Sequence, residues 1–142
     1  MKPLARPLGK YLCCAIDDDK PFDFIVPVPL HWRKRWSRGF NQAELLAREV
    51  ARKRGTPVVR VLRRKKPTAT QAGLTSAGRK RNVVSAFALR SAADVRGKRI
   101  LLVDDVMTTG ATANACANVL KRGGAKSVSL ATLARVDRRW TG

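Results

Sequence analysis

Four consecutive branched aliphatic residues, Ile100 to Val103, constrain the fold of this chain more than any other feature. A run without polar alternation predicts a strand buried on both faces, as in a parallel sheet. Parallel strands need crossover connections, usually helices. The stretch from Ala111 to Leu120 has apolar residues at helical spacing, and Gly123 and Gly124 end that pattern. The sequence therefore predicts an α/β fold with a strand, a loop and a helix in this order.

Between this strand and this helix lie two acids and a turn of small residues, Thr108, Thr109, Gly110 and Thr112. Open α/β sheets bind ligands at the carboxyl ends of their strands, and the N–H groups that begin a helix favour a phosphate. Because carboxylates repel phosphate, Asp104 and Asp105 need paired sugar hydroxyls, a hard cation such as Mg²⁺, or both. The alternative is a solvated acid pair followed by a capping threonine.

The segment from Val103 to Thr112, VDDVMTTGAT, resembles the phosphoribosyl diphosphate (PRPP) binding motif of type I phosphoribosyltransferases. The resemblance implies a central parallel sheet of about five strands flanked by helices, with a mobile basic flap. It also implies that Asp104 and Asp105 are catalytic and hold the ribose hydroxyls, and that Mg²⁺ accompanies PRPP as cofactor. The implied PRPP-binding residues are Asp104, Asp105, Val106, Met107, Thr108, Thr109, Gly110, Ala111 and Thr112.

Four further blocks are similar to the ComF family, a branch of the phosphoribosyltransferases associated with natural transformation; they are residues 23–31, 38–47, 71–74 and 79–83. The resemblance implies a role in DNA uptake, with the competence machinery as partner. It places the diphosphate loop at Val28, Pro29 and Leu30 and lets Arg79 or Arg81 close from the flap. ComF members usually carry a four-cysteine zinc ribbon ahead of this region. No CxxC pair occurs here, so we expect no zinc ligands and one domain over residues 1–142.

The chain is strongly basic, with 30 Lys and Arg against 10 acids and a net charge of +20. This excess indicates diphosphate substrates, nucleic acid, or only a solvated basic surface. The basic flap, residues 63–83, could close over a diphosphate, follow a nucleic-acid backbone, or have no partner. A second hypothesis is therefore a competence protein that binds single-stranded DNA without transferase activity. Its candidate nucleic-acid residues are Arg33, Lys34, Arg35, Arg63, Arg64, Lys65 and Lys66.

The remaining elements follow from periodicity and turn residues. A helix near the amino end, with Leu4, Leu8, Leu12 and Ile16 on one face, should follow Pro3 or Pro7 and pack on the sheet. A capping pair, Asn41 and Glu44, should begin a helix over 42–53. Strands are expected at 24–26 or 24–28, 58–62, 82–89 and 127–134, with a turn at 92–98 and a right-handed parallel crossover between the first two strands.

Isolated special residues add little to this picture. His31, the only histidine, is either catalytic or simply exposed, and Trp32 and Trp36 either cover apolar surface or stack on bases. The three cysteines, at 13, 14 and 116, have no metal spacing and should be buried in a reducing compartment. No apolar run approaches the roughly 18–20 residues of a membrane span, so we expect no membrane insertion and a cytoplasmic protein.

Overall fold

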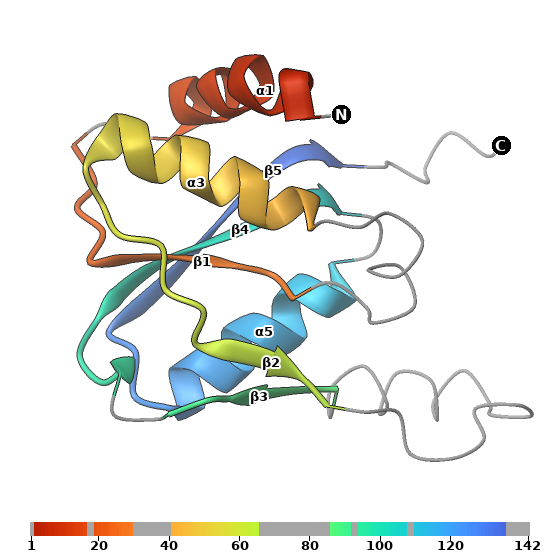
Figure 1. The fold of residues 1–142 in the computed structure, drawn as a ribbon. Helices are drawn as coiled ribbons and strands as arrows, with labels where there is room; N and C mark the ends of the chain where they lie inside the picture. The colour runs from red at the N-terminus through yellow and green to blue at the C-terminus, as the bar shows by residue number, and fades with distance from the viewer. Residues whose placement is uncertain are drawn as a thin grey trace, which may run out of the picture.

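The computed structural model describes residues 2–16, 19–29, 41–65, 86–91, 94–107 and 110–135, and the statements below concern these residues. Figure 1 shows how helices and strands alternate along them. In chain order the elements are α1 (Lys2–Ala15), β1 (Phe24–Pro27), α3 (Gln42–Arg54), β2 (Leu62–Arg64), β3 (Phe87–Leu89), β4 (Arg99–Met107), α5 (Ala111–Arg122) and β5 (Ser127–Arg135).

The main sheet is parallel, in the order β1-β4-β5, with β4 at its centre. One parallel bridge between Ile25 and Val58 extends it beyond β1. The backbone N–H of Ile25 donates to the carbonyl of Pro57 (2.9 Å), and that of Val59 donates to the carbonyl of Ile25 (2.9 Å). The predicted fold class is confirmed, although in the described part of the chain three strands form the parallel sheet rather than about five.

The predicted strand at 58–62 is wrong in extent. After the bridge at Val58, the chain leaves the main sheet, and β2 pairs with β3 in an antiparallel ribbon of two strands. Backbone hydrogen bonds from Lys65 to Ala86 (2.7 Å) and from Arg90 to Val61 (2.8 Å) close this ribbon at its two ends. The predicted strand at 82–89 is therefore present as Phe87–Leu89, and residues 82–85 lie outside the described part.

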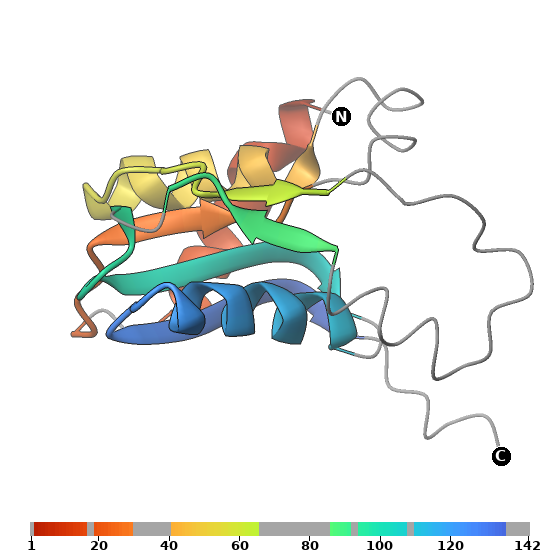
Figure 2. The same cartoon turned by 90° about the horizontal axis from the view of Figure 1, so that it is seen from below.

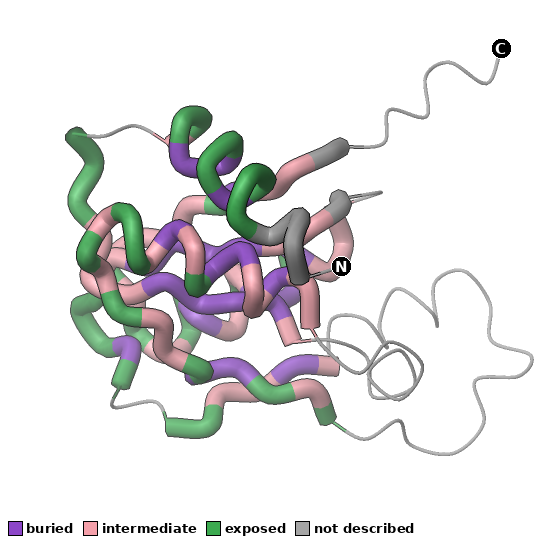
Figure 3. Tube along the Cα trace, turned by 45° about the horizontal axis from the view of Figure 1, so that its top comes forward, coloured by how far each residue is buried: buried purple, intermediate pink, exposed green. Residues whose placement is uncertain are grey.

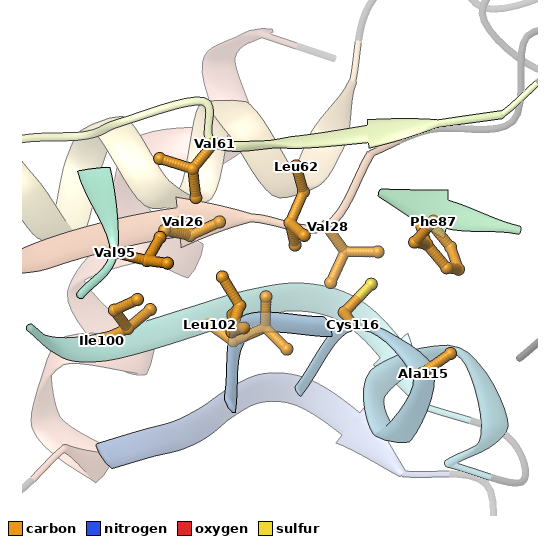
Figure 4. Close-up of a cluster of buried hydrophobic side chains, with 11 residues drawn as sticks. Val26, Val28, Val61, Leu62, Phe87, Val95, Ile100, Leu102, Ala115 and Cys116 are labelled. Atoms are coloured by element: carbon orange, nitrogen blue, oxygen red, sulfur yellow. The ribbon is translucent and has the colours of Figure 1, made fainter. Parts of the chain in front are cut away.

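Helices and the ribbon cover the main sheet on both faces. Figure 2 shows α5 and the ribbon on one face, with α1 and α3 on the other. Ile100 and Leu102 pack on the α5 side, whereas Leu101 and Val103 pack on the α3 side, and all four are at most 1% exposed. Figure 3 marks this burial along the trace, and Figure 4 shows the core beneath the ribbon. The prediction of a strand buried on both faces is confirmed.

The helix α1 is present as predicted, but its apolar face was wrong. Leu12 is 1% exposed and packs with residues of α3 and β5, whereas Leu8 is 40% exposed. The buried line runs through Gly9, Leu12 and Cys13, one position along from the predicted one. Gly9 explains the shift, because a Cβ there would lie 2.4 Å from Cβ of Glu49 on α3. The helix therefore approaches α3 most closely at its glycine.

The remaining boundaries agree with the sequence. The α3 helix ends at Gly55, whose φ of 66° favours glycine, and a turn occupies residues 94–97. Cys13 and Cys116 are buried as expected, but Cys14 is exposed on the outer side of α1, which corrects the expectation for that residue. None of the helices in the described ranges is long and apolar enough to cross a membrane.

Candidate functional site

The carboxyl edge of the main sheet brings together the parts of the chain from which a ligand site was predicted. Figure 1 shows the ends of β1, β4 and β5 at the same edge as the beginnings of α3 and α5. The N–H of Val28, the residue after β1, donates to the carbonyl of Val103 on β4 (2.9 Å). The predicted diphosphate loop therefore begins beside the residue that precedes Asp104.

Asp104 and Asp105 lie inside β4 and not in a loop after it, which corrects the predicted end of the strand. The strand continues to Met107 because its backbone pairs with β5, with Asp104 opposite Thr132 and Met107 opposite Arg135. Both acids are half-buried. Because side chains alternate along a strand, Asp104 lies on the α5 side of the sheet and Asp105 on the α3 side. A sugar at this edge would therefore meet carboxylates from two sides.

Local hydrogen bonds hold this acid pair in place. The N–H of Asp105 donates to Oδ1 of Asp104 (2.9 Å), and the hydroxyl of Thr132 on β5 donates to the carbonyl of Asp105 (3.2 Å). The first bond fixes the orientation of the Asp104 carboxylate, and the second fixes the backbone between the two acids. The strand end is thus pre-organised, which lowers the entropic cost of binding a ligand there.

The beginning of α5 has the features that a phosphate site needs. Gly110 precedes the helix with φ 80° and ψ 0°, a left-handed conformation that favours glycine, and no side chain caps the helix there. No acid lies in the first turn of α5. The dipole of the helix and its first N–H groups favour an anion at this end. Of the predicted phosphate turn, Gly110, Ala111 and Thr112 are placed here, whereas Thr108 and Thr109 lie outside the described residues.

Asn41 links the end of β1 to the beginning of α3. Its Oδ1 accepts from the N–H of Ala43 (3.1 Å), which confirms the predicted cap, and its Nδ2 donates to the carbonyl of Val28 (3.1 Å). Glu44, the predicted second half of the cap, instead pairs with Arg48 and Arg60. The contact between Asn41 and Val28 joins residues 13 apart in the sequence, and the sequence offered no signal for it.

The buried thiol of Cys116 lies within the electrostatic reach of the site. Burial raises the pKa of Cys116 to about 12, the negative charge of Asp104 raises it further, and the positive charge of Arg64 acts in the opposite direction. Cys116 is 0% exposed on α5 and belongs to the core that contains Val28 and Phe87 (Figure 4). The packing that supports this edge therefore places Asp104 and Arg64 around one buried sulfur.

The basic residues predicted to bind nucleic acid are only partly described. Arg63 and Lys65 are exposed, and Arg64 is half-buried with its guanidinium carbon 4.9 Å from the centre of the Phe87 ring. Among the described residues, no group of three or more His, Cys, Asp or Glu side chains could hold a metal ion. The predicted residues that lie outside the described part are Leu30, His31, Trp32, Arg33, Lys34, Arg35, Trp36, Lys66, Arg79 and Arg81.

Solved structures with the same fold identify the class of the domain. The chain aligns with glutamine PRPP amidotransferase from B. subtilis at a TM-score of 0.62 and 23% identity, covering 89% of this chain and 25% of that one. It aligns with an adenine phosphoribosyltransferase at a TM-score of 0.60 and 18% identity, covering 94% of this chain and 68% of that one. At these identities the comparison concerns the fold alone, which is that of the type I phosphoribosyltransferases.

Sequence comparisons give the family. The model of the phosphoribosyl transferase domain matches residues 36–141. Competence protein F of Haemophilus influenzae is 36% identical over 92% of this chain and 60% of its own length. DNA utilization protein YhgH of Salmonella typhi is 42% identical over 80% and 49%, and competence protein ComFC of Bacillus subtilis is 37% identical over 82% and 46%. The chain belongs to the phosphoribosyltransferase domain family, in its ComF branch, and spans about half the length of these curated relatives.

Proposed function

We propose that this domain binds PRPP, or another ligand with a 5-phosphoribosyl group, at the carboxyl edge of its main sheet. The observation that carries the proposal is the fixed acid pair on β4, which is followed within a few residues by the uncapped beginning of α5. Carboxylates accept hydrogen bonds from sugar hydroxyls, and helix N–H groups donate to phosphate. A ribose 5-phosphate carries both kinds of group at the matching separation of one sugar ring.

In this proposal the protein acts by positioning and by electrostatics. Displacement at C1 of the ribose develops positive charge on the ring, so the carboxylates of Asp104 and Asp105 would hold the hydroxyls and stabilise that charge. Gly110, Ala111 and Thr112 would fix the 5′-phosphate through the beginning of α5. Val28 and Pro29 lie beside Asp104, where a diphosphate on C1 would leave. No strong side-chain base is required.

Mg²⁺ fits this site as a companion of the ligand. The donors described at the edge are two carboxylates, which are hard oxygen ligands but too few for a complete protein cage. Mg²⁺ usually binds through one or two carboxylates together with the phosphates of a substrate, as the acid pair and a diphosphate would provide. When bound, the ion would neutralise charge on the leaving diphosphate.

The role that we propose in the cell is the handling of DNA during uptake. Relatives over most of this chain are named competence protein and DNA utilization protein, so a part in natural transformation, together with the uptake machinery, is the natural assignment. We place the domain in the cytoplasm, because the exposed thiol of Cys14 is free and such thiols persist in reducing compartments.

Calorimetric titration with PRPP and Mg²⁺ tests the proposed site. The double variant Asp104→Asn with Asp105→Asn should abolish binding, because amides cannot supply the lost negative charge. Asp94→Asn is the matched control, since Asp94 is an exposed acid in the turn before β4, at the opposite edge of the sheet, and it should bind like the wild-type protein. Equal affinity in the double variant would exclude the acid pair as the ligand site.

A second candidate function is binding of single-stranded DNA, which the net charge of +20 and the exposed Arg63 and Lys65 favour. A titration against a labelled oligonucleotide at several salt concentrations tests it. The logarithm of the affinity should fall with the logarithm of salt by about 0.7 for each phosphate contacted. A flat dependence on salt would argue against this function. The two functions are compatible, with DNA as the cellular context and the pocket as the chemical site.

A further inference from the structure

Strand pairing separates the basic run at 63–65 into side chains of two kinds. In β2, Arg63 is exposed and Arg64 is half-buried, because neighbouring residues of a strand face opposite sides. Lys65, just after the strand, is exposed again. Arg63 and Lys65 therefore belong to the outer surface, whereas Arg64 extends toward the space between the ribbon and α5.

Arg64 lacks a counter-charge where it lies. Its guanidinium stacks on Phe87, with 4.9 Å between the guanidinium carbon and the ring centre. No carboxylate within the described ranges forms an ion pair with it, in contrast to Arg48, Arg52, Arg60 and Arg99, which all pair with acids. Burial lowers the pKa of Arg64, so its charged form is partly desolvated without compensation. Such a cation is costly unless an anion joins it.

The location of Arg64 points to the source of that anion. Arg64 and Asp104 both act on the charge of the Cys116 thiol, which lies on the second turn of α5. Phe87, beneath the guanidinium, packs in the same cluster as Cys116, Ala115 and Val28 (Figure 4). Arg64 thus lies on the α5 side of the sheet, the side that Asp104 faces and from which α5 begins.

We propose that Arg64 is a phosphate-binding residue of this site and supplies the cation for an anionic group of the bound ligand. The inference rests on the proposed function and extends it to a residue outside the acid pair and the helix turn. A guanidinium presents five donors in a fork that fits phosphate oxygens, and Phe87 holds its plane in one orientation. The group bound is either the 5′-phosphate or the diphosphate on C1.

Calorimetry with three probes, each with Mg²⁺, tests the proposal: PRPP, ribose 5-phosphate and inorganic diphosphate. Arg64→Gln should weaken the binding of PRPP about 10- to 100-fold, as expected for losing hydrogen bonds to a charged group. Arg64→Lys, which keeps the charge, should recover part of the loss. Arg63→Gln removes the same charge from the outer face of the same strand, and it should change the affinity less than about twofold.

The outcomes separate the alternatives. A loss for PRPP and diphosphate, with ribose 5-phosphate unaffected, assigns Arg64 to the diphosphate, whereas a loss that includes ribose 5-phosphate assigns it to the 5′-phosphate. Arg64→Gln should keep the urea midpoint of unfolding, since no ion pair is broken. Unchanged affinity for all three probes, or a loss that appears only with a lowered urea midpoint, overturns the role of Arg64 and leaves the proposed function intact. Failure of the wild-type protein to bind any probe overturns the proposed function itself.

Discussion

The side-chain amide of Asn41 donates a hydrogen bond to the carbonyl of Val28, and the N–H of Val28 donates to the carbonyl of Val103. One side chain thus connects the beginning of α3 to the end of β1, and through it to the residue before Asp104. The same asparagine caps α3 through its other atom, Oδ1. Asn41 therefore has two separable roles, one in stability and one in the geometry of the site.

Replacing Asn41 by aspartate should separate these roles. Asp caps helices as well as Asn does, but it cannot donate to the carbonyl of Val28, so stability should stay near the wild-type value while affinity for PRPP falls. Asn41→Ala should lose about 1 kcal/mol of unfolding free energy as well, because the cap is also removed. Urea unfolding and calorimetry on both variants measure this. Wild-type affinity in Asn41→Asp would mean that the contact with Val28 does not serve the site.

The ion pair between Asp23 and Arg99 should make stability depend on pH at the acid end. Arg99 donates three hydrogen bonds to the Asp23 carboxylate, at 2.8, 3.0 and 3.1 Å, and these bonds hold the pKa of Asp23 well below its usual range. A carboxyl whose pKa is depressed by folding stabilises the fold above its unfolded pKa, near 4, and this contribution is lost as pH falls. Asp23→Asn should therefore be less stable than wild type in urea at pH 7, and the gap should narrow from about pH 4 downward. A gap that stays constant from pH 7 to pH 2 would contradict this.

Gly123, at the end of α5, should not tolerate a methyl group. Its φ is −72°, so alanine is allowed by the backbone, but the added Cβ would lie 2.3 Å from Cδ1 of Leu89 and 2.8 Å from Cγ2 of Val95. Overpacking of this kind costs about 1–3 kcal/mol. Asn114→Ala, at an exposed position of α5, is the control and should change stability by less than about 0.5 kcal/mol. Thermal unfolding of the two variants checks the contact between α5 and β3.

The three free thiols should differ sharply in reactivity. Cys14 is exposed, whereas Cys116 is fully buried with a pKa raised to about 12, and Cys13 is buried against the α3 side of the core. Because the thiolate is the reactive form, iodoacetamide at pH 8 should label Cys14 first. Mass spectrometry of the native protein should find one modified cysteine, and three after unfolding in urea. Early labelling of Cys116 would show that the core under the site opens readily.

The parts of the fold that the sequence predicts well are those encoded by local patterns. Ile100 to Val103 and the helix after Gly110 are confirmed because continuous apolar character and helical spacing are properties of neighbouring residues. The cap at Asn41 is likewise local. The same holds for the VDDVMTTGAT motif, whose described residues lie at the strand end and the helix beginning where that reasoning expects a ligand.

The features that local patterns missed depend on partners distant in the sequence. The strand containing Asp104 and Asp105 continues because β5, nearly 30 residues later, pairs with it. The face of α1 is set by the fit of Gly9 onto Glu49, and four leucine and isoleucine residues at regular spacing cannot reveal that fit. Arg64 appears in the sequence as one of four basic neighbours, and only the pairing of β2 with β3 shows that it faces inward.

A crystal structure of the protein with PRPP and Mg²⁺ tests the central claim most directly. The predicted result is electron density for the 5′-phosphate at the beginning of α5, within hydrogen-bond distance of the backbone of Gly110 to Thr112, with the ribose hydroxyls on the carboxylates of Asp104 and Asp105. Density for the ligand elsewhere, or an edge of the sheet without ligand at concentrations where calorimetry shows binding, would contradict it.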